Sequence, residues 1–72
     1  MVEMMWRLVG RSATPIVCGV YRTAAGLKVI SHYADSTDAL IRGERVADMD
    51  VAYDVAAVWK QAALELGLTE IR

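Results

Sequence analysis

The chain has 72 residues, a formal net charge of −1 and a hydrophobic content of 56%. A chain of this length forms one domain and buries only about 60% of its unfolded surface, so its stability as a monomer is expected to be modest. Its single cysteine excludes an internal disulfide, and one cysteine with one histidine excludes a closed structural zinc site within one chain. Self-association is therefore the favoured additional source of stability.

The N-terminus does not read as a signal peptide, because Glu3 and Arg7 interrupt any apolar run. No stretch approaches the roughly 18 apolar residues of a membrane span. The sequence therefore predicts a cytoplasmic protein that does not associate with membranes.

The first two thirds of the chain have the pattern of β-strands. Apolar and other residues alternate at the N-terminus, and Ala24-Ala25-Gly26 fits a three-residue hairpin loop with glycine in the left-handed position. The charges of Arg42, Glu44 and Arg45 are typical of an edge strand. Four strands are expected, at residues 2–9, 16–23, 27–34 and 40–46.

The hairpin register determines which side chains share a face of the sheet. If Thr23 faces Leu27, the numbers of paired residues sum to fifty. One face then holds the pairs Cys18–His32, Val20–Ile30 and Ile16–Ala34, and the other holds Tyr21–Val29 and Val17–Tyr33. Both faces are apolar, whereas a single helix covers only one of them.

The last long segment, residues 49–66, predicts the only helix. Asp48 suits the N-cap, and Gly67 supplies the left-handed residue that commonly ends a helix. At 100° per residue an apolar arc forms, whose members are Val51, Val55, Val58, Trp59, Ala62 and Leu66. We expect Val51, Val55, Trp59, Ala62 and Leu66 to be buried against strand residues such as Trp6, Val20 and Ile30. A second, narrower strip consists of Tyr53, Ala57 and Leu64.

Together these elements predict a single α+β domain over residues 1–72. The expected architecture is an antiparallel meander of three or four strands, followed by one C-terminal amphipathic helix packed across one face of the sheet.

The sequence offers little catalytic chemistry. Cys18 and His32 resemble a nucleophile and its base, but Cys18 sits in an apolar run, so we interpret them as a structural pair. Asp48, Asp50 and Asp54 lack the spacing of a calcium loop, and helix capping accounts for the first two. We therefore expect no enzyme, no catalytic residue, no cofactor and no metal.

Two functions from different classes remain open. The favoured one is a non-catalytic module that self-associates, as a homodimer, or binds another protein. Its candidate interface residues are Val17, Tyr21, Val29, Tyr33, Tyr53, Ala57 and Leu64. The alternative is a small nucleic-acid-binding protein that uses the sheet, although the net charge opposes it. Its candidate contacts are Arg22, Lys28, Arg42 and Arg45.

Three short motifs carry a resemblance to known sequences: Trp6-Arg7-Leu8, the segment 18–23 followed by Gly26-Leu27, and the segment 56–60 ahead of Gly67. With these motifs the chain resembles a group of small uncharacterised bacterial proteins, chiefly from α-proteobacteria. The resemblance implies a bacterial source and a strand–hairpin–helix pattern, and it supplies no functional site.

Overall fold

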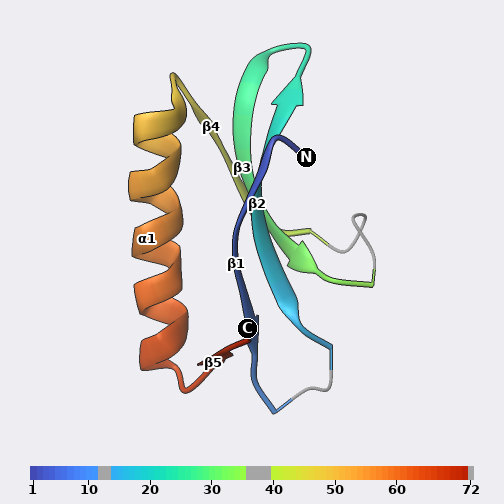
Figure 1. Cartoon of the computed structure of the whole chain (residues 1–72), viewed down its shortest axis with the longest axis vertical. Coiled ribbons are helices and arrows are strands. Elements are labelled where there is room, and N and C mark those ends of the chain that lie inside the picture. The colour runs from blue at the N-terminus through green and yellow to red at the C-terminus, as the bar shows by residue number, and fades with distance from the viewer. Residues whose placement is uncertain (12–13, 36–39, 72) are drawn as a thin grey trace.

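The computed structural model describes residues 1–11, 14–35 and 40–71, and it confirms the predicted α+β architecture (Figure 1). The elements are β1 (Glu3–Val9), β2 (Ile16–Thr23), β3 (Gly26–Tyr33), β4 (Leu40–Val46), α1 (Met49–Glu65) and β5 (Thr69–Glu70). The strands and the helix expected from the sequence agree with these bounds to within one residue. Within the described ranges, no helix is long and apolar enough to cross a membrane.

The five strands form one antiparallel sheet in the order β4-β3-β2-β1-β5, and α1 lies across one of its faces (Figure 1). The sequence predicts only three or four strands, because β5 is two residues long. Gly67, with φ of +97°, turns the chain after α1. The backbone N–H of Leu68 then donates to the carbonyl of Ala63, and the next two residues pair with the end of β1.

The register of the β2–β3 hairpin differs from the predicted one by one residue. Thr23 pairs with Gly26 and Tyr21 with Lys28, so the numbers of paired residues sum to 49. Gly26, with φ of +114°, belongs to β3 itself and leaves a loop of two alanines. The Thr23 hydroxyl stabilises this turn, since it donates to the Gly26 carbonyl and accepts from the Ala25 N–H. A slip of one residue exchanges the two faces of β3.

The core lies between α1 and the sheet. Its buried members are Trp6, Leu8, Cys18, Val20 and Val29 from the strands and Ala52, Ala56 and Trp59 from the helix. The small side chains of Ala52 and Ala56 let the helix axis approach the sheet closely. The indole N–H of Trp6 donates to the Ala56 carbonyl at 2.8 Å, which ties β1 to the middle of α1.

The helix presents a different face to the sheet from the predicted one. The expected burial of Trp59 is confirmed, and Val55 is half-buried against the core. The prediction was wrong for Val51, Ala62 and Leu66, which are exposed. At 100° per residue the alanine face that packs is rotated by roughly 80° from the valine-rich arc. Close approach favoured the smaller side chains over the more apolar ones.

The strand partners of the helix were predicted in part. Trp6 and Val20 belong to the core, as expected. Ile30 does not, because the observed register places it opposite Gly19 on the face that the helix leaves uncovered.

Candidate interaction surfaces

Cys18 and His32 do not form a pair. Cys18 is fully buried in the core and lies opposite Ser31, whereas His32 lies opposite Val17 on the helix-free face. Burial raises the pKa of the Cys18 thiol to about 12, which leaves no reactive thiolate at neutral pH. The predicted Cys18–His32 contact was therefore wrong, because it depended on the shifted register. Within the described part of the chain, no three His, Cys, Asp or Glu residues gather as a metal site.

His32 instead anchors a tyrosine. Its Nδ1 lies 2.8 Å from the Tyr33 carbonyl oxygen, and its Nε2 lies 2.8 Å from the Tyr21 hydroxyl. A carbonyl oxygen can only accept, so Nδ1 carries a proton, and in the neutral ring Nε2 accepts from the Tyr21 hydroxyl. The two rings meet edge to face, with centroids 6.0 Å apart. Burial and the neighbouring Cys18 raise the pKa of Tyr21, so its hydroxyl stays protonated at neutral pH. The bond fixes the Tyr21 ring on the helix-free face.

An exposed apolar strip runs along the flank of α1 that faces β4. We call Val51, Val58, Ala62 and Leu66 the helix strip. Val58 is 66% exposed and Leu66 82% exposed, and the half-buried Val55 lies among them. These are the side chains that the sequence pattern assigns to the core. In the structure all of them except Val55 are exposed.

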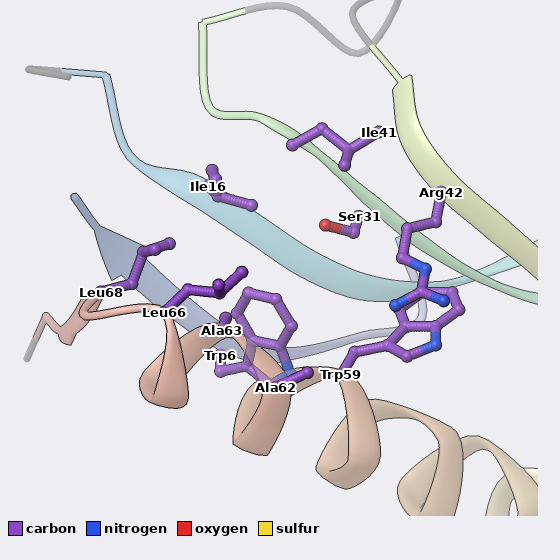
Figure 2. A pocket seen from close by; sticks show the side chains of 10 residues that line it. All are labelled: Trp6, Ile16, Ser31, Ile41, Arg42, Trp59, Ala62, Ala63, Leu66 and Leu68. Atoms are coloured by element: carbon purple, nitrogen blue, oxygen red, sulfur yellow. The ribbon is translucent and has the colours of Figure 1, made fainter. Parts of the chain in front are cut away.

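A cleft of about 210 Å³ adjoins the helix strip, between the C-terminal half of α1 and the sheet (Figure 2). It is lined by Trp6, Ile16, Ser31, Ile41, Arg42, Trp59, Ala62, Ala63, Leu66 and Leu68. In Figure 1, the end of β4 lies next to the start of α1, and the beginning of the strand lies away from the helix. The small side chains of Ala62 and Ala63 line the cleft on the helix side.

Two polar groups face this apolar cleft. The Arg42 guanidinium lies 4.8 Å from the centre of a Trp59 ring, a cation–π contact at the cleft wall. The Ser31 side chain is 3% exposed, and its hydroxyl points into the cleft (Figure 2). Among the described residues that line the cleft there is no histidine, aspartate or glutamate that could act as a general base toward Ser31.

The acidic side chains of the described strands all lie on one face of the sheet, and most of the cations lie on the other. The glutamates Glu3, Glu44 and Glu70 all lie on the side of the sheet that α1 covers, opposite the core residues Val20, Val29 and Leu8 respectively. The cations Arg7, Lys28 and Arg45 lie on the other side, which we call the cationic face. No acidic residue of the described strands shares that face with them.

This sorting corrects the predicted nucleic-acid surface. Lys28 and Arg45 share a face, but Arg22 and Arg42 lie on the helix side. Arg7 was missed: its alternation with the buried Trp6 and Leu8 puts it on the helix-free face, but its place opposite Val17 depends on the long-range pairing of β1 with β2.

The predicted sheet interface is also divided between the two faces. Val17 and Tyr21 lie on the cationic face, while Val29 is fully buried in the core, so it cannot serve as a contact there. Tyr33 pairs with Ile16 at the strand end on the helix side and is exposed. The four residues do not form one surface, because their grouping relied on the shifted register.

The second, narrower strip predicted from the sequence lies on the flank of α1 opposite the helix strip, toward β1 and β5. Tyr53, Ala57 and Leu64 are all exposed there, as the pattern predicts. A hydrogen bond to the Glu3 carboxylate raises the pKa of Tyr53, and Lys60 forms a salt bridge with Glu70. Polar contacts therefore already occupy part of this flank.

No protein-family model, curated protein or solved structure matches this chain. What the chain itself offers are two surfaces of different chemistry, the apolar helix strip with its cleft and the cationic face of the sheet.

Proposed function

We propose that this chain is a non-catalytic interaction module that forms a homodimer through the helix strip and the cleft beside it. The observation that carries the proposal is the exposure of Val58 and Leu66, at 66% and 82%. Apolar side chains repeat at helical spacing on this flank, and the monomer leaves most of them exposed to solvent. A contiguous exposed apolar surface on a small domain is typical of a contact site.

The spacing of the strip suits a second helix. Val51, Val55, Val58 and Ala62 follow one another at steps of four, three and four residues, the repeat that packs helices side by side. In an antiparallel pair centred near Val58, Val51 of one copy faces Leu66 of the other, and Val55 faces Ala62. The strip is therefore complementary to itself, which is what a twofold contact requires.

The available area is sufficient for a modest dimer. Burying about 500 Å² per chain, roughly a tenth of the monomer surface of 4734 Å², reaches the lower limit of specific interfaces. If about half of the roughly 1,000 Å² buried by the two chains together is apolar, about 25 cal/mol per Å² gives a contribution of roughly 12 kcal/mol, against an association cost of about 4–15 kcal/mol. A dissociation constant in the micromolar range is consistent with these terms.

Sedimentation equilibrium between about 5 and 200 µM tests the proposal, since a micromolar dimer dissociates within this range. We expect the wild-type mass to rise toward twice 7.9 kDa. The double variant Val58→Glu, Leu66→Glu should remain a monomer, because it places charges in the interface.

The control variant carries Tyr53→Glu and Leu64→Glu on the opposite flank of the helix, where the wild-type side chains are also exposed. It should dimerise like the wild type. A wild-type mass of one chain throughout would contradict the proposal, and so would a dimer that survives both substitutions in the strip.

A further inference from the structure

We infer that the cationic face binds the backbone of single-stranded nucleic acid. This surface lies on the side of the sheet opposite α1, so the inference does not rest on the homodimer. It rests on the sorting of charge between the two faces, on the placement of two neighbouring cations, and on the aromatic ring fixed beside them.

The cations of this face have no ion-pair partner among the described residues. In the part of the chain that the structure describes, Arg7, Lys28 and Arg45 form no salt bridge; the one ion pair there joins Lys60 to Glu70 on the helix side. Lys28 and Arg45 are directly opposite each other on neighbouring strands. Like charges in this position repel. A phosphate between them removes that repulsion.

The net charge of the chain does not represent this surface. At physiological salt a charge acts over about 8 Å. The strand glutamates lie on the opposite face of the sheet, and the acids of α1, among them Asp50 and Asp54, belong to the helix that covers that opposite face. A polyanion at the cationic face therefore meets three positive charges and no acid of the described strands.

The same face offers a surface on which bases can stack. Tyr21, Lys28 and Arg45 form one row across β2, β3 and β4. The bond to His32 holds the Tyr21 ring in place, so little side-chain entropy is lost when a base packs on it. Stacking on an aromatic ring beside a cationic track is how proteins bind single strands without reading their sequence. In duplex DNA the base faces are stacked on one another, so a duplex would contact this surface only through its phosphates and the cations.

Fluorescence anisotropy with a labelled mixed-sequence DNA single strand of about 12 nucleotides tests the inference. At 50 mM salt we expect a dissociation constant of about 10–100 µM. Three phosphate contacts at about −0.7 each give a salt slope near −2, so affinity should fall roughly 20-fold between 50 and 200 mM salt.

Three single variants locate the site. Arg45→Glu and Lys28→Gln should each weaken binding by at least about 5-fold, since each removes a phosphate contact. Arg22→Glu is the matched control: Arg22 is exposed on the same hairpin but on the helix side, so its substitution should change affinity by less than about 2-fold. Circular dichroism checks that each variant is folded.

Several results would overturn the inference. One is no binding at 50 mM salt. A second is an equal loss of affinity in Arg22→Glu and Arg45→Glu, which would show attraction by overall charge alone. A third is equal affinity for inorganic polyphosphate, which has the charge but no bases, and a fourth is tighter binding of duplex than of single-stranded DNA.

Discussion

Replacing Trp6 by Phe tests how β1 holds the helix. The indole N–H of Trp6 donates to the Ala56 carbonyl at 2.8 Å inside the core, a link between positions 50 residues apart. Phe keeps an aromatic ring in the core but removes this donor and leaves a small void. The lost hydrogen bond costs about 1 kcal/mol and the void a further 1–2 kcal/mol, so we expect a loss of about 2–3 kcal/mol.

For a domain of 72 residues, 1 kcal/mol corresponds to about 6–7 °C in the melting temperature. Trp6→Phe should therefore melt roughly 12–20 °C lower than the wild type in a calorimetric scan at equal protein concentration. Tyr53→Phe is the control, because it removes a hydrogen bond to Glu3 at the surface and should cost less than about 0.5 kcal/mol. Equal, small losses in both variants would refute the role given to the buried link.

Two further predictions concern backbone strain and the buried thiol. Gly26→Ala should destabilise the fold by about 1–2 kcal/mol in a urea titration, because φ of +114° is strained for alanine although no atom lies within 4 Å of its Cβ. Gly43→Ala should cost less, since the atom closest to its Cβ, at 2.9 Å, belongs to the flexible end of Lys28 and the Val29 carbonyl oxygen lies at 3.8 Å, an ordinary contact; the reverse order would contradict this reasoning. Cys18 should resist alkylation at pH 7.5 and react in urea. The pKa of its thiol is about 12 in the folded protein and 9.0 in an unfolded chain. The stability that the neutral thiol contributes should therefore be fully present below pH 9 and be lost as the pH rises from 9 toward 12. No such fall in a pH series of urea titrations would exclude a buried neutral thiol.

The order of the elements followed from local signals in the sequence. Alternation, the hairpin glycine, the cap at Asp48 and the turn at Gly67 all act within a few residues. The structure retains each of them, with the Asp48 side chain accepting from the Val51 N–H. These local signals do not determine how the elements pair and pack against one another.

The errors all concern the register and packing of one element against another. Gly26 can end the hairpin loop or begin the next strand, and that choice reverses the faces of β3, including Val29 and His32. The helix could pack its valines or its alanines, and the closer approach of Ala52 and Ala56 decided. The strand β5 pairs only because Gly67 returns the chain to β1.

The residues of each surface could be predicted only as far as the strand register could be predicted. Of the residues assigned to nucleic acid, Lys28 and Arg45 do share a face, because they pair directly on adjacent strands. Arg7 joins them across two further strands, beyond the reach of local pattern. The helix strip was not predicted as a surface because of an error of the same kind, since its valines belong to the apolar arc that periodicity assigns to the core.

Crosslinking through Val58→Cys tests the central claim, that two copies meet along the helix strip. Position 58 lies near the centre of the proposed antiparallel contact, and the native Cys18 is buried and does not compete. Under mild oxidation this variant should form a disulfide-linked species of twice 7.9 kDa on non-reducing gels, because the two thiols come within bonding range. Leu64→Cys, exposed on the other flank, should stay monomeric. No covalent dimer of Val58→Cys, or equal crosslinking of both variants, would contradict the account.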